Sequence, residues 1–181
     1  IRSRSLKGMA HIPEDRHKHG LVLDYNPAEN FILKSYFDSK YQNKGFIKFD
    51  KMYETANKLI EQYDVRSGEG AKSITRGMSG GNQQKVVLSK WMFSEPDILI
   101  LDEPTRGIDV GAKFEIYTII NELVEQGKGV IVISSGLPEI LGMCDRVYIM
   151  NEGKIIGEMD IKNASQEEIM KCIVKDKKED N

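Results

Sequence analysis

Short apolar runs alternate along this chain with stretches in which apolar residues recur every three or four positions. The runs predict strands, at residues 8–13, 97–102, 130–135, 146–150 and 154–159. The second and third contain no polar alternation, so we expect them to be buried on both faces, as strands of a parallel sheet are. The last two are separated by an Asn-Glu-Gly turn and are expected to pair with each other.

The periodic stretches predict helices, at residues 28–37, 50–63, 79–93, 112–126 and from 165 onward. Asn26 and Pro27 open the first helix, and Asp50 is expected to cap the second. Ser165 and Glu168 form a capping box for the last. The expected inward faces are Tyr53, Ala56, Ile60 and Tyr63 in the second helix, and Ile116, Ile120, Leu123 and Val124 in the fourth. The alternation of strands and helices favours an α/β fold with a mostly parallel sheet.

Two carboxylates end the apolar run in the sequence ILILDEPTRGID, residues 98–109. This places Asp102 and Glu103 at the carboxyl end of a buried strand, where open α/β sheets hold their ligands. Asp102 suits Mg²⁺, which prefers few carboxylates together with water and phosphate oxygens. Glu103 is suited to polarise an attacking water. The alternative is a strand that ends in a solvated acidic turn, and the Pro-Thr and Gly-Ile-Asp that follow disfavour it.

A second motif, MSGGNQQKVV at residues 78–87, begins a helix. Ser79 is a natural N-cap, and Gly80 and Gly81 leave the backbone N–H groups of the first turn uncovered. With the helix dipole these groups make an anion site. A plain serine-capped helix is the alternative, but this helix leads directly to the strand that ends in Asp-Glu, which favours a phosphate site.

Together the two motifs resemble the signature motif, Walker B strand and D-loop of an ABC ATPase. In detail they are similar to the second nucleotide-binding domain of the fused two-domain ATPases of simple-sugar importers, of the ribose or galactose type. The resemblance covers about residues 8–174 and implies the P-loop NTPase (ABC ATPase) fold, a mostly parallel sheet with a helical subdomain. It implies a helical subdomain at about 24–94, a core at 1–23 and 95–174, and a charged, frayed tail at 175–181.

The resemblance also implies roles for individual residues, with ATP and Mg²⁺ as cofactors. The implied nucleotide-binding positions are Ser79, Gly80, Gly81, Asn82, Gln83, Asp109, Glu14 and Ser135. In this family the first three face the γ-phosphate of ATP held by the opposite domain. Asp102 becomes the Walker B aspartate that holds Mg²⁺, and Glu103 takes the catalytic position. Asp109 becomes the D-loop aspartate at the seam between the two domains.

Three departures from the general ABC pattern stand at or beside these motifs. Asn82 replaces the usual signature glutamine, and Glu14 stands at or near the place of the Q-loop glutamine. Ser135 stands where most ABC domains carry the switch histidine, and a serine cannot act as a cationic or proton-shuttling partner. The last two substitutions resemble second domains whose own ATP site is degenerate, and they put turnover at Glu103 in doubt.

A phosphate-binding loop of the form G-x-x-x-x-G-K-S/T is missing from the sequence. The nearest stretch, residues 67–73, has Arg66 and Ala71 where the two glycines belong and follows a predicted helix, so we interpret it as a surface loop. In the family the phosphate loop lies upstream of Ile1. We therefore expect a chain cut from a longer one, inactive alone. We also expect a gap in the sheet between residues 130–135 and 146–150, where the strand leading into that loop belongs.

Composition narrows the class of partner. The chain carries 26 basic and 28 acidic residues, a net charge of -2, so no general affinity for nucleic acid is expected. No apolar run is long enough to span a membrane. Cys144 and Cys172 have no ligand-like spacing and are expected to be reduced thiols. The histidines at 11, 17 and 19 lie in a charged loop without a matching fourth ligand, which disfavours a metal site.

The resemblance implies a subunit on the cytoplasmic face of the cell membrane. Its partners would be a first nucleotide-binding domain or second ATPase subunit, membrane permease subunits docked through a coupling helix, and, indirectly, a periplasmic or lipoprotein substrate-binding protein. We expect the docking groove within residues 14–46, with Tyr25, Phe31, Tyr36 and Phe37 as candidate lining residues. Three alternatives remain: a nucleoside-importer ATPase, which residues 11–30 resemble somewhat, a soluble non-transport ABC protein, and a non-catalytic interaction domain.

Overall fold

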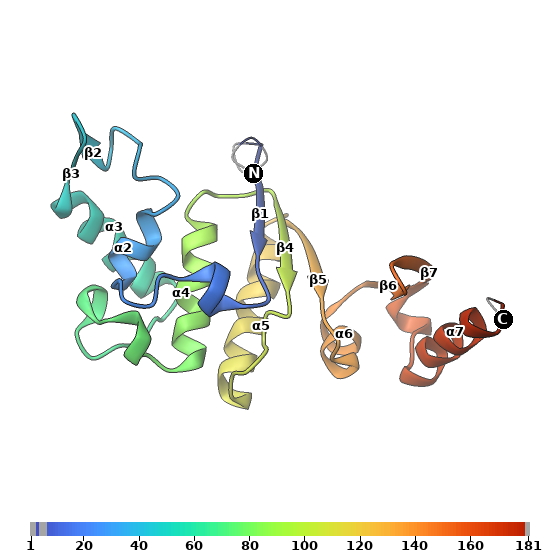
Figure 1. The fold of residues 1–181 in the computed structure, drawn as a ribbon. Coiled ribbons are helices and arrows are strands. Elements are labelled where there is room, and N and C mark those ends of the chain that lie inside the picture. The colour runs from blue at the N-terminus through green and yellow to red at the C-terminus, as the bar shows by residue number, and fades with distance from the viewer. Residues whose placement is uncertain (1–2, 4–6, 180–181) are drawn as a thin grey trace. The chain divides into compact units, whose positions relative to one another are not determined.

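The chain forms two compact units, a first that ends at Ile133 and a second that begins at Ser134. The computed structural model describes residues 3 and 7–179 (Figure 1). This division does not separate residues 24–94 from the rest, so the helical subdomain expected from the sequence stays a prediction.

A parallel sheet is the centre of the first unit. It consists of β1 (Met9–Ile12), β4 (Ile98–Asp102) and β5 (Gly129–Ile133), in the order β1-β4-β5. Met9 is paired with Ile98 at one end of the sheet, and Asp102 with Ile133 at the other. Ile12, Leu99 and Leu101 are fully buried. The expected parallel α/β arrangement is therefore confirmed for these three strands.

The expectation that both central strands are buried on two faces is wrong. In β5 the exposed fraction of Ile131 is 53%, and Ile98 of β4 is exposed as well. Helices pack on this sheet through β1 and β5, and within the described part of the first unit alternate residues of the sheet remain uncovered. Among the described residues β5 pairs only with β4, as expected of a sheet that lacks the strand leading into a phosphate loop.

Helices α2 (Pro27–Ile32) and α3 (Phe49–Gln62) depart in detail from the sequence prediction. Asn26 caps α2 in a complete capping box with Glu29, as its sequence predicts, but the helix ends at Ile32 and the chain goes on in turns. Lys48 rather than Asp50 is the N-cap of α3. The inward face of α3 is formed by Met52, Ala56, Leu59 and Tyr63, so of the predicted set only Ala56 and Tyr63 are buried.

Helices α4 (Gly80–Met92) and α5 (Val110–Glu125) lie side by side next to the sheet (Figure 1). Ser79 caps α4 as predicted, and Asp109 caps α5, which therefore begins before residue 112. The predicted inward residues Ile116, Ile120 and Leu123 are buried. Val124 is 45% exposed instead, because one helical step turns it away from the core position that Leu123 occupies.

Several short elements of the first unit do not follow from the apolar pattern. They are a single π-helical turn (Arg16–Gly20), the hairpin of β2 (Gln42–Asn43) and β3 (Phe46–Ile47), and the 3₁₀ turns Gly70–Lys72 and Thr75–Gly77. The stretch 67–73 follows α3 rather than a strand and contains the first of these 3₁₀ turns. This agrees with its interpretation as a loop.

The second unit contains an antiparallel pair and three helical elements. Strands β6 (Arg146–Asn151) and β7 (Lys154–Asp160) pair as predicted, with an irregularity between Ile149 and Met150. The helical elements are α6 (Leu137–Met143), the 3₁₀ turn Ile161–Asn163 and α7 (Gln166–Glu179). The Ser165 hydroxyl accepts a hydrogen bond from the Glu168 N–H at 3.2 Å, as a cap does. The backbone of residues 175–179 continues α7, and the rest of the predicted tail lies outside the described residues.

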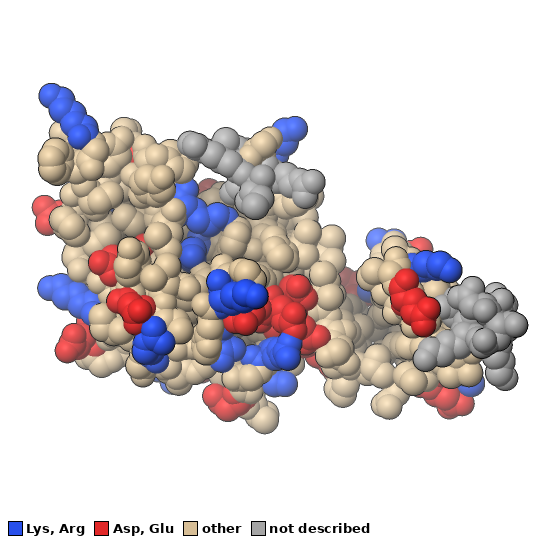
Figure 2. Space-filling model, viewed as in Figure 1, with Lys and Arg blue, Asp and Glu red and all other residues tan. Residues whose placement is uncertain are grey.

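Within residues 3 and 7–179 no helix combines the length and apolar character that a membrane span needs. Figure 2 shows lysine, arginine and acidic side chains interspersed on the visible face of the first unit.

Candidate functional site

The starts of α4 and α5 meet at the two motifs predicted from the sequence. The Ser79 hydroxyl accepts hydrogen bonds from the backbone N–H of Asn82 at 3.4 Å and from its side-chain amide at 2.9 Å. The Asp109 carboxylate accepts from the N–H of Ala112 at 2.9 Å. A Cβ atom on Gly81 would lie 2.5 Å from the Cβ of Ala112, so the two helices touch at a place where only glycine fits.

A pocket of about 220 Å³ opens between these helix starts. It is lined by Ser79, Gly81, Asn82, Asp109, Gly111 and Ala112 from the motifs, and by Arg66, Lys85 and Glu115 beside them. The structure therefore brings Ser79, Gly81, Asn82 and Asp109 of the predicted site into one pocket, whereas Gly80 and Gln83 are not among its lining residues. The backbone N–H groups of Gly80 and Gly81 lie in the first turn of α4, the end of a helix at which anions can bind.

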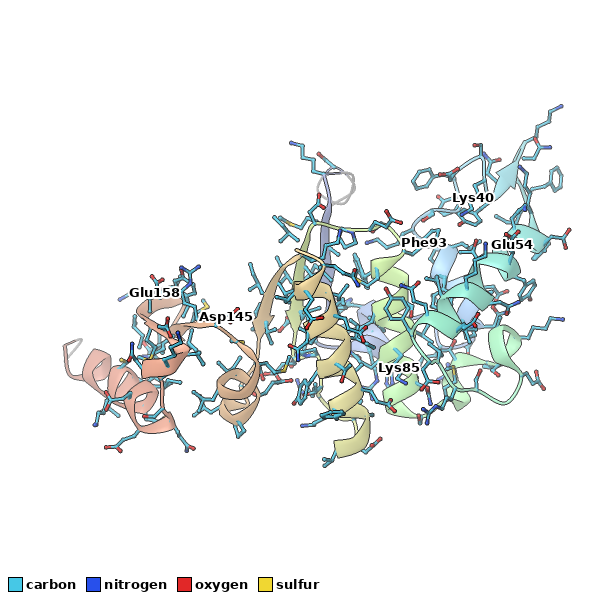
Figure 3. The ribbon with its side chains drawn as sticks, turned by 180° about the vertical axis from the view of Figure 1, so that it is seen from behind. Lys40, Glu54, Lys85, Phe93, Asp145 and Glu158 are labelled. Carbon is cyan, nitrogen blue, oxygen red and sulfur yellow. The ribbon has the colours of Figure 1, made fainter. Side chains whose placement is uncertain are left out.

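Asn82 and Lys85 tie this pocket to its surroundings. The Asn82 side chain also accepts the N–H of Arg66 at 2.7 Å, so it holds the preceding loop and Ser79 at once. The Lys85 side chain is 3% exposed, and its ammonium lies 2.7 Å from the Glu115 carboxylate on α5. It lies 3.4 Å from the Asp64 carboxylate and donates to the Asp64 carbonyl at 2.8 Å. Lys85 is labelled on α4 in Figure 3. The sequence motifs do not predict any of these hydrogen bonds or ion pairs.

Gln83 turns away from the pocket. Its side chain is 4% exposed, its amide donates to the Thr75 carbonyl at 3.1 Å, and its oxygen lies 2.8 Å from Nε2 of His17. The Arg16 Nε also donates to this oxygen, at 3.4 Å. The sequence-based role of Gln83 was contact with nucleotide, whereas in the structure its side-chain groups serve internal hydrogen bonds.

Asp102 and Glu103 lie at the carboxyl end of β4, as predicted. Asp102 is the last residue of the strand and is partly buried. Glu103 has a positive φ of 46°, which turns the chain sharply, and its N–H donates to the Ile133 carbonyl at 2.8 Å. Among the described residues no three His, Cys, Asp or Glu side chains gather in a way that could hold a metal ion. One carboxylate suits Mg²⁺, whose other ligands are usually water and phosphate oxygens.

The two remaining predicted residues lie in different units. Glu14 follows β1 and forms an ion pair with the Arg106 guanidinium, so its carboxylate is engaged by the loop after β4. Ser135 belongs to the second unit and is exposed there. A larger pocket of about 480 Å³ is lined mainly by residues of α3 and α5 and contains none of the motif residues.

A family model described as ABC transporter matches residues 2–106, more than half of the chain. This chain belongs to the ABC transporter family. The solved ATP-binding cassette MJ1267 in its ADP conformation is similar, with a TM-score of 0.72 and 19% identity, covering 96% of this chain and 70% of that one. A dimeric post-hydrolysis structure of the cassette MJ0796, bound to ADP and Pi, gives 0.70 and 18%, covering 89% and 67%. At such identities these likenesses show the fold alone, and they confirm the ABC ATPase fold.

Curated relatives are much closer in sequence. The L-arabinose transport ATP-binding protein AraG of Geobacillus stearothermophilus is 48% identical over 168 residues, 93% of this chain and 32% of the relative. The xylose import ATP-binding protein XylG of Geobacillus kaustophilus is 48% identical over 165 residues, 91% and 32%. The ribose import ATP-binding protein RbsA of Bacillus subtilis is 47% identical over 164 residues, 91% and 33%. The chain spans about a third of the length of these relatives.

Proposed function

We propose that this chain works within the ATP-binding subunit of a bacterial ABC importer for a simple sugar, where it helps to couple ATP binding and hydrolysis to transport. The observation that carries the proposal is the shared pocket of the signature helix and the D-loop helix. An anion-binding helix start and an aspartate-capped helix lie together beside a strand that ends in two carboxylates. The names of the relatives, which import arabinose, xylose and ribose, support a simple sugar as the cargo.

In this proposal the start of α4 binds the γ-phosphate of an ATP held by a facing nucleotide-binding domain. The Ser79 hydroxyl and the N–H groups of Gly80 and Gly81 are the donors, and the exposure of Ser79 leaves it accessible to such a partner. Asn82 holds the Ser79 hydroxyl by its 2.9 Å hydrogen bond. Asp109 lines the same pocket and takes its place at the seam between the two domains.

At the other site, Asp102 would hold Mg²⁺ and Glu103 would orient a water. The ion neutralises phosphate charge when it is bound. Two features support a degenerate site here: Glu14 is engaged by Arg106, and Ser135 replaces a histidine. We therefore propose that the chain contributes mainly to the ATP site of its partner.

The partners that fit this proposal are a first nucleotide-binding domain or second ATPase subunit and the permease subunits of the transporter. A coupling helix of the permease would dock within residues 14–46. Tyr25, Tyr36 and Phe37 are exposed there and are available for docking, whereas Phe31 is fully buried in the core. A periplasmic or lipoprotein substrate-binding protein would act through the permease, and the chain would work at the cytoplasmic face of the membrane.

The alternatives have less support. A nucleoside importer is the second candidate, because residues 11–30 somewhat resemble the ATPases of such importers. The relatives described above are named for sugars, which favours the sugar importer. A non-transport ABC protein or an isolated interaction domain has no specific observation in its favour.

A chimera tests the proposal. The third of the Bacillus subtilis ribose relative that aligns with this chain is replaced by this sequence, and the chimera is expressed in a strain that lacks its own copy. We expect restored ribose uptake and vesicle-associated ATPase activity, and we expect both to be lost in the Ser79→Arg variant.

The experiment has three informative outcomes. Ribose uptake by the chimera that is lost in its Ser79→Arg variant supports the proposal. A stable chimera that hydrolyses ATP but imports no ribose contradicts the importer role and favours a non-transport ABC protein. A stable chimera without ATPase activity contradicts the nucleotide role itself.

A further inference from the structure

The exposed segment between β1 and α2 forms hydrogen bonds both to the signature helix α4 and to the loop after β4. Asp15 caps its π-helical turn by accepting the N–H of His17 at 2.9 Å and of Lys18 at 3.0 Å. These backbone hydrogen bonds, that of Lys18 foremost, lower the pKa of the Asp15 carboxyl. At the far end of the turn, Lys90 of α4 donates to the Gly20 carbonyl at 2.7 Å. These hydrogen bonds define the conformation of the segment and its position on α4.

Arg16 is the residue of this segment that reaches the D-loop. Its Nη1 donates to the Arg106 carbonyl at 2.8 Å and its Nη2 to the Gly107 carbonyl at 3.3 Å. Its Nε donates to Gln83 of α4 at 3.4 Å. One guanidinium therefore joins two consecutive carbonyls of the loop after β4 to the first turns of the signature helix.

The start of α4 and the loop at Gly107 both lie close to this guanidinium. A Cβ atom on Gly80 would lie 3.0 Å from Nη2 of Arg16 and 3.1 Å from the Gly107 carbonyl oxygen. Gly107 itself has a positive φ of 66°, a conformation that favours glycine. The start of α4, Arg16 and the loop at Gly107 are packed against one another, so a shift of one displaces the others.

We propose that Arg16 is a positioning residue that holds the loop at Arg106 and Gly107, and with it Asp109, in register with Ser79 at the start of α4. The claim that this register matters for ATP turnover rests on the proposed function of Ser79 and Asp109. The claim that Arg16 holds the loop in place rests on the structure alone.

The geometry requires arginine rather than a positive charge alone. The planar guanidinium presents donors in a fixed fork to two carbonyls and an amide oxygen, whereas a lysine ammonium is a compact point charge. Arg16→Lys therefore keeps the charge and loses the fork. Arg76 offers a matched control, because its guanidinium forms an exposed ion pair with Asp24 and, among the described residues, donates no hydrogen bond to the loop after β4.

The structural test is amide hydrogen exchange of the chain, read by mass spectrometry over peptides that cover residues 79–83 and 103–109. Loss of two or three hydrogen bonds predicts exchange in these peptides about tenfold faster in Arg16→Lys, with little change elsewhere. Arg76→Lys should leave them unchanged. Unchanged exchange in Arg16→Lys would overturn the proposal, and so would uniformly faster exchange across the unit, which indicates general destabilisation.

The functional test uses the ribose chimera. Misplacement of Ser79 relative to the γ-phosphate predicts a fall of about tenfold in kcat with little change in KM for ATP. Arg76→Lys should keep the parent rate. Faster exchange at 103–109 with an unchanged kcat would overturn the link between this register and turnover. A parent chimera without ATPase activity would instead contradict the proposed function, which keeps the two failures distinguishable.

Discussion

Lys85 illustrates at the scale of one residue how charge is accommodated inside the first unit. Its side chain is almost fully buried, yet its ammonium meets the Glu115 carboxylate, the Asp64 carboxylate and the Asp64 carbonyl. These acceptors replace the water that burial removes. The two carboxylates come from α5 and from the residues that follow α3, so a single lysine ties two other parts of the unit to α4.

Replacing Lys85 by methionine should destabilise the chain by about 1–3 kcal/mol, because the chain length is kept while the hydrogen bonds and ion pairs of a buried charge are lost. Chemical denaturation measures this change. Lys58→Met is the matched control, since Lys58 pairs with Glu54 on the surface of α3, and it should give no measurable change. Equal effects of the two substitutions would contradict the account of Lys85.

Lys34 and Lys90 differ from Lys85 because no carboxylate within the described part of the chain neutralises them and their like charges lie near each other. The Lys34 ammonium lies 3.0 Å from the centre of the Trp91 ring and has no hydrogen-bond partner among the described residues. Burial, together with the charge of Lys90, lowers the pKa of Lys34 to about 8, and burial lowers the pKa of Lys90 to about 8. In the unfolded chain both return to the ordinary value of about 10.5.

Stability should therefore rise with pH above about 8. Between the folded and unfolded pKa values the unfolded chain binds more protons, so raising the pH favours the folded state. Denaturation from about pH 7 to 9, where tyrosine with its ordinary pKa of about 10 is still largely protonated, measures the slope. Lys34→Met should flatten the rise, while Lys40→Met, an exposed control, should keep it. A falling or flat profile in the parent chain would refute the prediction.

The sequence reveals the local part of the site at this scale and not the rest. Ser79 was predicted as an N-cap because a cap is formed within four residues of chain. The cap formed by Asp109 is equally local but was not predicted, since the helix was expected to begin only at residue 112. The Arg16 and Lys85 contacts join residues far apart in sequence, and no periodicity or spacing signals them. The inward turn of Gln83 was missed for the same reason, since it depends on His17 and Thr75.

At the scale of elements, the close approach of α4 and α5 is the feature on which the site depends. It is possible because Gly81 faces Ala112 without a side chain. Lys85 and Glu115 pair one turn further along the two helices and hold the same contact.

Gly81→Ala should destabilise the chain by about 1–3 kcal/mol, because the new methyl group would overlap the side chain of Ala112 and force the helices apart. Thermal or chemical denaturation measures the loss. Gly77→Ala is the control, since a Cβ atom there meets nothing within 4 Å and the backbone does not require glycine. A neutral Gly81→Ala would mean that the helices are not in the contact described.

The order of the long elements was predictable, whereas their exposed faces were not. The caps of α2, α4 and α7 and the pairing of β6 with β7 follow from local signals. The face of α3 was misjudged because both Tyr53 and Met52 fit a helical stripe, and tertiary packing selects Met52. The exposure of Ile131 in β5 reflects what covers the sheet, which the strand's own residues do not encode.

At the scale of the whole molecule, the chain carries signature, Walker B and D-loop segments but no G-x-x-x-x-G-K-S/T sequence. Most of the affinity of a P-loop ATPase for nucleotide comes from the backbone N–H groups and lysine of that loop. Titration of the 181-residue chain with MgATP in a calorimeter should therefore give weak binding at best and no turnover. Micromolar affinity would require another phosphate-binding element and would contradict the assignment of residues 67–73 as a surface loop.

The most direct test of the central claim, that the signature helix of this chain serves the ATP site of a facing domain, is the steady-state ATPase rate of the ribose chimera with Ser79→Arg or Glu103→Gln. Removal of the serine donor and obstruction of the helix start should lower the rate about a hundredfold or more. Glu103→Gln should have the smaller effect, because in the proposed function Glu103 serves a degenerate site that contributes little to ATP turnover. A larger loss from Glu103→Gln than from Ser79→Arg would contradict the account and would place the working site on this chain's own Walker B strand.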